Sequence, residues 1–244
     1  MIALAPRLVP AEETVATTIP ALYARFDQQA ARWAAKTGVS CPTGCGRCCE
    51  TTVPPCSDAE ARLIAHHLLD SHHERLDTIL NRDPDGIDSG PPCPFYSAEG
   101  DYHCTIYAVR PFFCRAFGYA SATDKRGRPA YRLCKHMPAP VSFAGSRELP
   151  LRDAEHPSLP LPPSMSVVQA RIDGVSEGLS EPTPIDRAVR SQIERILIAR
   201  QYARAEAFVD ATCAPAHQFD STDPERDPER TDPSPPIAPG SRSA

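Results

Sequence analysis

Apolar residues recur every three or four positions along residues 18–36. They fall at Ile19, Leu22, Phe26, Ala30 and Trp33. This spacing predicts an amphipathic helix, and Gly38 stands where a left-handed residue commonly closes one. Trp33 lies on the apolar stripe, so we expect it to fill a core rather than to contact a ligand.

A second helix is predicted to start at Ser57. The residues Ser57-Asp-Ala-Glu60 form a capping box, in which the serine accepts from a free amide and the glutamate bonds back to the cap. The apolar positions that follow predict its buried side, which is Leu63, Ile64, Leu68, Leu76, Ile79 and Leu80.

Two further helices are expected towards the C-terminus. Ser164 to Leu179 is compatible with a short one. Thr183 followed by Pro184 resembles a cap with proline at the first helical position, and that helix is predicted to run to Asp210. Its predicted apolar face is Ile185, Val189, Ile193, Ile196, Leu197 and Phe208.

The remaining segments have little periodicity. Prolines are frequent over residues 137–163, which predicts an irregular connection. Residues 214–244 are rich in Pro, Asp, Glu, Arg and Ser and repeat Asp-Pro-Glu-Arg, so we expect a disordered tail. The predicted fold is mainly α, with amphipathic helices around an irregular cysteine-rich metal-binding module. The predicted segments are an N-terminal helical part (1–40), a cysteine cluster (41–136), a Pro-rich connection with C-terminal helices (137–213) and the tail (214–244).

The net charge and the N-terminal residues limit which binding partners and which cellular location we expect. With 26 Lys and Arg against 31 Asp and Glu the net charge is −5, which gives no reason to expect a nucleic acid or an anionic membrane. No run of about 18 apolar residues occurs, and no basic segment precedes an apolar one near Met1. We therefore expect a cytoplasmic protein with no membrane partner, and the sequence indicates no particular protein partner.

Ten cysteines are many for a chain in a reducing compartment, where thiols bind metal or catalyse more often than they form disulfides. Eight follow a fixed pattern, and Gly44 and Gly46 permit the turns that bring sulfurs together. The pattern is Cys41-x3-Cys45-x2-Cys48-Cys49, then Cys93-Pro-Phe, Cys104-Thr-Ile-Tyr, Arg110-Pro-Phe-Phe-Cys114-Arg and Cys134. A metal site is favoured over a disulfide framework or a set of unrelated buried cysteines.

Spacing leaves the kind of site open. Adjacent side chains in an extended or turn backbone point apart, so Cys48 and Cys49 are expected to serve different roles. Two closed four-thiolate sites use eight cysteines without remainder, and one iron–sulfur cluster with four accessory thiols fits equally. Either centre carries about −2, which Arg47, Arg110 and Arg115, each within four residues of a candidate cysteine, are placed to offset.

Other chemistries are less well supported. His103 and His136 adjoin candidate cysteines but are expected to lie near the site rather than to ligate. His66, His67, His72 and His73 have the wrong helical spacing for one ion. Cys41-x3-Cys45-x2-Cys48 has the spacing of radical S-adenosylmethionine enzymes, but Arg47 replaces their usual aromatic residue and the strand–helix alternation of their barrel is missing. No catalytic residue is identified.

The whole cysteine pattern resembles the YkgJ-type cysteine-cluster family, and the resemblance covers about two-fifths of the chain. It implies a domain that chelates zinc or an iron–sulfur cluster, with no settled reaction. An iron–sulfur oxidoreductase, or an accessory to a modifying enzyme such as a protein methylase, is the alternative that it suggests. Cys56 and Cys213 do not match the pattern. The metal ligands that the resemblance implies are Cys41, Cys45, Cys48, Cys49, Cys93, Cys104, Cys114 and Cys134.

Overall fold

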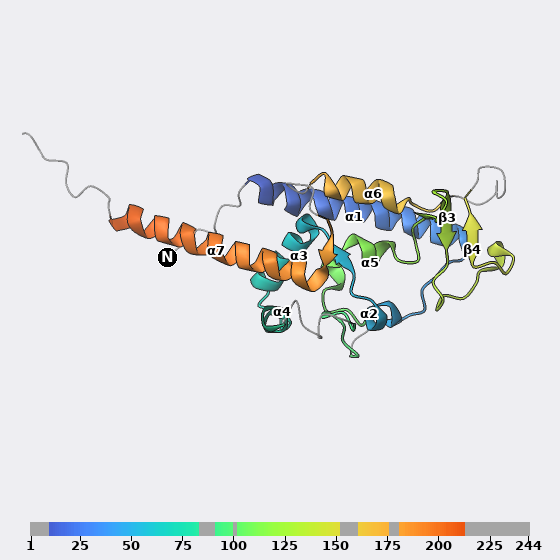
Figure 1. Ribbon diagram of the computed structural model, residues 1–244, viewed down its shortest axis with the longest axis horizontal. Helices are drawn as coiled ribbons and strands as arrows, with labels where there is room; N and C mark the ends of the chain where they lie inside the picture. Colours follow the sequence, from blue (N-terminus) through green and yellow to red (C-terminus); the bar gives the residue numbers. More distant parts are fainter. Residues whose placement is uncertain (1–9, 83–90, 100–101, 152–160, 176–180, 213–244) are drawn as a thin grey trace, which may run out of the picture. The chain divides into compact units, whose positions relative to one another are not determined.

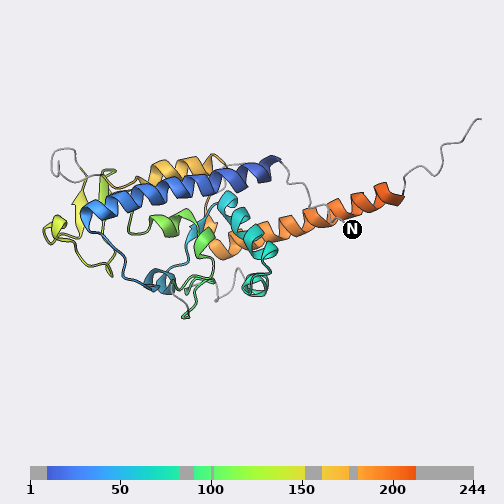
Figure 2. The same ribbon diagram turned by 180° about the vertical axis from the view of Figure 1, so that it is seen from behind.

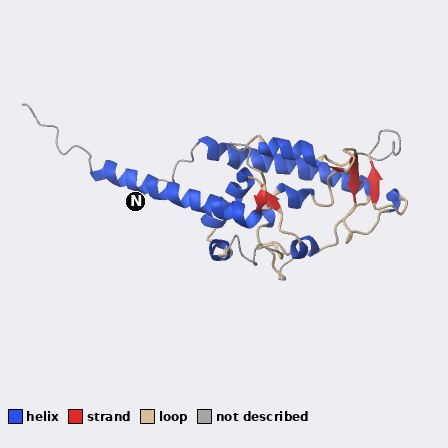
Figure 3. Ribbon diagram, viewed as in Figure 1, coloured by secondary structure: helices blue, strands red, loops and turns tan. Residues whose placement is uncertain are grey.

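The computed structural model describes residues 10–82, 91–99, 102–151, 161–175 and 181–212. By its contacts the chain divides into two units, Met1–Ala203 and Arg204–Ala244. The described residues are mainly helical, with seven α-helices and five short strands, as the sequence predicts (Figure 3). The predicted tail, 214–244, lies outside the described residues.

Helix α1 spans Pro10–Thr37, eight residues longer at its start than the pattern predicts. A proline suits the first position because its missing N–H would have no helical partner there. Val15, one turn before Ile19, extends the buried stripe, and Trp33 is 3% exposed, which confirms its packing role. Gly38 closes the helix with φ +77°, and its N–H donates to the Ala34 carbonyl at 2.8 Å.

The second predicted helix is two helices, α3 (Asp58–Asp70) and α4 (Leu76–Asn81). The capping box at Ser57 and Glu60 is confirmed. The prediction of one continuous helix is wrong, because His72 takes a left-handed φ of +47° and turns the chain. Because the helix ends before His73, the distance from His73 to the histidines of α3 does not follow from the rise per residue of one helix. The ring centroids of His67 and His73 lie 5.8 Å apart.

Helices α6 (Met165–Asp173) and α7 (Ile185–Thr212) follow. Residues 176–179 of the predicted short helix lie outside the described residues. Thr183 and Pro184 form strand β5 instead of capping α7, and pair antiparallel with β1 (Pro55–Cys56). Four of the six predicted core residues of α7 are buried. Leu197 and Phe208 are 43% and 70% exposed, so their predicted burial is wrong.

A small antiparallel sheet spans two segments that the sequence predicts to be irregular, the cysteine-rich module (41–136) and the Pro-rich connection (137–163). It consists of β2 (Ala122–Thr123), β3 (Pro129–Arg132) and β4 (Glu148–Pro150) in that order, with Ala122 opposite Ala130. The turn between β2 and β3 forms because the Asp124 carboxylate accepts from the backbone of Arg126 and Arg128. The sequence does not predict this sheet, since strands of two to four residues are too short to show alternation.

Three buried clusters hold the described residues of the first unit together. One packs α1 against α3, α6 and the short helix α5 (Phe112–Ala116), around Phe26 and Phe112. A second joins α3, α4 and the first part of α7 to the 93–106 segment, and a third surrounds Trp33 and Tyr131 beside the small sheet. Figures 1 and 2 show α6 running alongside α1, with α3 and α5 next to α1. The short helix α2 (Arg47–Thr51) lies between the α1 and α3 segments of the chain. Among the described helices, none combines the length and apolarity that crossing a bilayer requires.

Candidate metal centre

One cavity of about 440 Å³ gathers the predicted ligands. Its walls come from five separate segments of the chain. Its lining includes all eight predicted cysteines, which are Cys41, Cys45, Cys48, Cys49, Cys93, Cys104, Cys114 and Cys134. Cys56 does not line it, and Cys213 lies outside the described residues. All nine described cysteines carry free thiols.

The first four cysteines follow α1 in a tight loop that runs into α2. The Cys41 N–H donates to the Tyr119 hydroxyl at 2.9 Å, and the Cys45 N–H donates to the Pro42 carbonyl at 3.1 Å. Cys48 and Cys49 both lie in α2, with their sulfurs 3.9 Å apart. The expectation that these two side chains point apart is therefore wrong, because the local backbone is helical rather than extended.

Gly46 lets the loop that carries Cys104 come close to α2. A Cβ placed on Gly46 would lie 2.6 Å from the Cβ of His103, closer than real carbon atoms approach. His103 itself has a left-handed φ of +51°, and its Nδ1 lies 2.9 Å from the Ser97 carbonyl oxygen. The glycine of the Cys45-Gly-Arg-Cys48 motif is thus required by packing rather than by its backbone conformation, because its φ of −94° is open to any residue.

Backbone hydrogen bonds connect Cys49, Cys93 and Cys104. The Cys93 N–H donates to the Cys49 carbonyl at 2.8 Å, and the Tyr96 N–H donates to the Cys93 carbonyl at 2.9 Å. Tyr96 and Cys104 face each other in an isolated antiparallel bridge. These bonds fix three ligand-bearing positions relative to one another without any metal.

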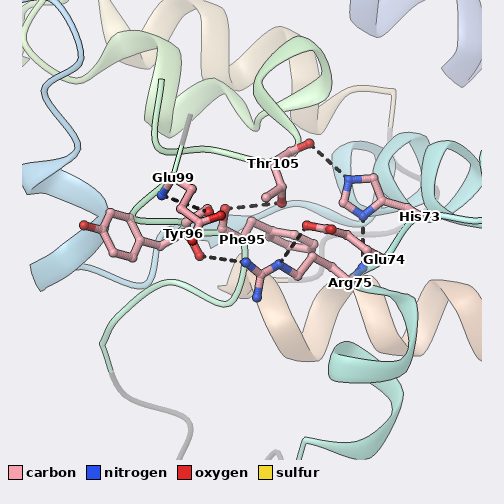
Figure 4. A network of polar contacts seen from close by, with 8 residues as sticks. His73, Glu74, Arg75, Phe95, Tyr96, Glu99 and Thr105 are labelled. Carbon is pink, nitrogen blue, oxygen red and sulfur yellow. Dashed lines mark hydrogen bonds and ion pairs between the residues drawn. The ribbon is translucent and has the colours of Figure 1, made fainter. Parts of the chain in front are cut away.

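A polar network anchors this bridge to the corner between α3 and α4 (Figure 4). The Arg75 N–H donates to His73 Nδ1 at 3.1 Å, so His73 Nε2 carries the proton that bonds the Thr105 carbonyl, also at 3.1 Å. The Arg75 guanidinium donates to the Tyr96 carbonyl at 3.2 Å, and the Tyr96 hydroxyl donates to Glu50 at 3.1 Å. The sequence gives no signal for this positioning role of His73, because Thr105 and Tyr96 are distant from it in the chain.

Cys114 is carried by α5, which a buried carboxylate holds in place. Glu60, 2% exposed, accepts the Phe112 N–H at 2.6 Å and the Tyr23 hydroxyl at 2.8 Å through Oε1. Its other oxygen accepts the Ser57 hydroxyl at 2.8 Å. The capping box found from sequence therefore does more than start α3, because the same glutamate joins α1, α3 and α5.

Cys134 is positioned by a close approach between Gly118 and the segment that contains Met137 and Cys134. Gly118 has φ +81°, and a Cβ there would lie 2.6 Å from Met137 Cε and 3.7 Å from Cys134 Cβ. The Tyr131 hydroxyl donates to the Gly118 carbonyl at 2.7 Å. Gly118 thus lets the end of α5 pack directly on the segment that carries Cys134.

The three arginines expected near the sulfurs have different surroundings. Arg47 is 62% exposed and pairs with Glu50 at 3.0 Å. Arg115 pairs with Asp27 at 2.7 Å and lies over the Tyr23 ring. The Arg110 guanidinium lies 3.7 Å from the Tyr107 ring centroid, and its charge favours the thiolate form of Cys48 and partly opposes the burial that raises the pKa of Cys104 and Cys114. Arg110 is therefore the cation that acts most widely on the cavity.

Burial keeps most of these thiols protonated in the absence of metal. Desolvation raises the pKa of Cys41 and of Cys93 to about 11, and it also raises the pKa of Cys104 and Cys114. At Cys48 the hydrogen bond from Cys49 instead lowers the pKa to about 6. A metal ion that binds thiolates here must therefore displace protons.

The donor set fits a thiophilic metal. Soft thiolates are the usual ligands of structural zinc and of iron–sulfur clusters. As the described side chains stand, no three Cys, His, Asp or Glu groups are arranged around one ion position. His136 also lines the cavity, whereas His103 contacts Gly46.

Comparison with known families agrees with this donor set. Residues 40–135 match the CxxCxxCC family model, described as "Putative zinc- or iron-chelating domain". We refer to this matched segment, residues 40–135, as the CxxCxxCC domain. The YkgJ-type resemblance drawn from the cysteine pattern is a family-level label for it. The CxxCxxCC domain contains all eight cavity cysteines and ends before Cys213. Comparison of the chain with curated proteins and with solved structures gave no match.

Proposed function

We propose that the CxxCxxCC domain binds zinc or an iron–sulfur cluster through the eight cysteines of its cavity. The observation that carries the proposal is that segments up to 93 residues apart, Cys41 to Cys134, bring the pattern cysteines to one cavity while Cys56 stays outside. Such clustering of thiols, most with a raised pKa, favours a cation that neutralises thiolates.

The proposed role of the metal is to hold an irregular region together. The cavity lining comes largely from loops and from α2 and α5, each five residues long. Such short helices have little stability of their own in water. A closed thiolate site supplies folding free energy directly, with apparent values of about 10–16 kcal/mol for zinc in small domains.

Elemental analysis of the full chain, purified without oxygen, tests the proposal. We expect one or two zinc ions per chain, or about four irons with matching sulfide. Cys48→Ser and Cys114→Ser should lower the metal content sharply, whereas Cys213→Ser, outside the pattern, should not. Folded protein free of metal, or equal losses in all three variants, would refute the proposed site.

The same preparation decides between the two kinds of centre. A zinc protein is colourless and does not respond to reductant, whereas a cluster is coloured and bleaches on reduction. A cluster would support the redox alternative, an iron–sulfur oxidoreductase or an accessory to a modifying enzyme. We also propose that the protein works in the cytoplasm, with its thiols unpaired. Intact-mass measurement on protein from its native host would contradict this if the cysteines were joined in disulfides.

A further inference from the structure

The geometry points to two adjacent metal sites in this cavity, each with four cysteines. The first site consists of Cys41, Cys45, Cys48 and Cys134, and the second of Cys49, Cys93, Cys104 and Cys114. This inference rests on the proposed function and goes beyond it by dividing the ligands.

The first four cysteines lie on the side of the cavity next to Tyr119. The Cys41 and Cys45 thiols are joined by a hydrogen bond, and the Cys41 thiol also interacts electrostatically with the thiols of Cys48 and Cys134. Cys41 is anchored through its N–H to the Tyr119 hydroxyl. The preceding residue, Gly118, is the one that packs against Cys134. Cys41 and Cys134 are therefore held near each other by one short segment, 118–119.

The second four are connected through the backbone. Cys49 and Cys93 share a hydrogen bond of 2.8 Å, and the bridge between Tyr96 and Cys104 begins three residues after Cys93. The Cys114 thiol interacts electrostatically with those of Cys93 and Cys104. Neither Cys45 nor Cys134 is among the thiols that influence this second group most.

The two groups are supported by different cores. Cys93 belongs to the buried cluster of α3, α4 and α7, and Cys49 and Cys104 pack against that cluster. Cys134 packs instead against the cluster around Trp33 and Tyr131. Because a closely packed core keeps its own side chains in place, Cys134 is held with a different core from Cys49, Cys93 and Cys104.

Cys48 and Cys49 form the junction between the sites. Cys48 interacts with Cys41 and also with Cys104 and Cys114, so it stands at the boundary. With Cys49 tied to Cys93 by the backbone, Cys48 completes the first set of four. Their sulfurs lie 3.9 Å apart, so two sites that divide these cysteines would meet at this point.

Space and charge also fit two centres. A sphere with the Zn–S radius of about 2.3 Å encloses only about 50 Å³, whereas the cavity measures about 440 Å³. Arg110 acts on Cys48 in the first group and on Cys104 and Cys114 in the second. One guanidinium between the groups is thus placed to offset negative charge from both sites.

Metal analysis of paired variants of the full chain tests the division. We expect two metal centres in the wild type and one in each of Cys45→Ser/Cys134→Ser and Cys93→Ser/Cys104→Ser. The matched control is Cys56→Ala, which removes a thiol outside the cavity and should keep both centres. One centre in the wild type, or loss of both centres in either double variant while circular dichroism shows a folded chain, would overturn the division but leave the proposed function intact. Wild type without metal would refute both.

A measurement on the unaltered protein covers the case in which a double variant does not fold. Wild-type chain is partly stripped with a chelator, its free thiols are alkylated, and the labelled cysteines are identified by mass spectrometry. We expect the four cysteines of one group to be labelled together in molecules that have lost half their metal. Labelling that mixes the two groups at this stage would overturn the inference.

Discussion

Single residues decide how closely the cysteine-bearing segments approach. Gly46 and Gly118 leave out a side chain where His103 and Met137 pass, and Glu60 gathers hydrogen bonds from three helices at a point with almost no solvent exposure. Capping and turn chemistry let the sequence identify Ser57, Glu60 and Gly38. The partners of Gly46, His73 and Glu60 are distant in the chain, so no local pattern contains them.

Replacing Gly46 tests the close approach to His103. Gly46→Ala should destabilise the protein by about 1–3 kcal/mol, because the added methyl overpacks a filled space. His103→Gly should restore most of the loss in the double variant, since it removes the clashing atom and suits the left-handed φ there. Denaturant unfolding measures both.

The control is Gly174→Ala, where the new Cβ meets only ordinary contacts of 3.5 Å. It should change the unfolding free energy little. Equal stability of Gly46→Ala and the wild type would show that the two segments are not packed as described.

Tyr23 gives a prediction with a pH dependence. Tyr23→Phe removes the hydroxyl that donates to buried Glu60 and should cost about 1.5–3 kcal/mol near pH 7. Desolvation, followed by the Glu60 charge, raises the pKa of Tyr23 in the folded state. The advantage of the wild type is therefore complete below the unfolded pKa of about 10 and shrinks above it, by up to about 1.4 kcal/mol per pH unit.

Measuring the unfolding free energies of wild type and Tyr23→Phe in parallel from pH 7 to 11 checks that their difference shrinks as the pH rises. Cysteine ionisation occurs in both chains and cancels in the difference. A difference that stays constant or grows above pH 10 would contradict the account of the Tyr23–Glu60 pair.

At the scale of elements, the long helices were predictable and the short pieces were not. Periodic apolar residues identified α1, α3 and the first half of α7, because their stripes fit a core over several turns. Helices α2 and α5 are only five residues long, and the 93–106 segment folds through backbone bonds to α2 and to itself. Tertiary contacts stabilise these elements, and they have no periodic apolar pattern that reveals them. The cysteine pattern therefore indicated which residues gather, but not which elements bring them together.

Phe112 tests whether the core positions α5. Its ring is fully buried and meets Phe26 edge-on at 4.9 Å between centroids. Phe112→Ala should cost about 3–5 kcal/mol and weaken metal retention, since α5 carries Cys114. Thermal unfolding and chelator competition measure the two effects.

Phe117→Ala is the matched control for stability, because Phe117 is 40% exposed in the same stretch of chain. Phe117→Ala should lower the free energy of unfolding by clearly less than Phe112→Ala does. If the two variants were equally stable, Phe112 would not be the residue that holds α5.

At the scale of the whole molecule, residues that belong to three buried clusters or pack against them contribute to a cavity lined by eight cysteines and three arginines. Without metal, burial and the neighbouring thiols raise the pKa of Cys41, Cys49 and Cys114 and oppose thiolate formation there. Binding a thiophilic cation replaces repulsion with coordination and joins segments that otherwise meet only through short contacts. The central claim is that metal–sulfur bonds complete the CxxCxxCC domain.

X-ray absorption of the metal in the full-length, anaerobically purified protein tests that claim most directly. For zinc we expect a first shell of four sulfur atoms at about 2.3 Å and no nitrogen or oxygen. For iron we expect sulfur neighbours followed by a nearby iron, as in a cluster. A first shell of nitrogen or oxygen, or a folded protein with no metal to measure, would contradict the account.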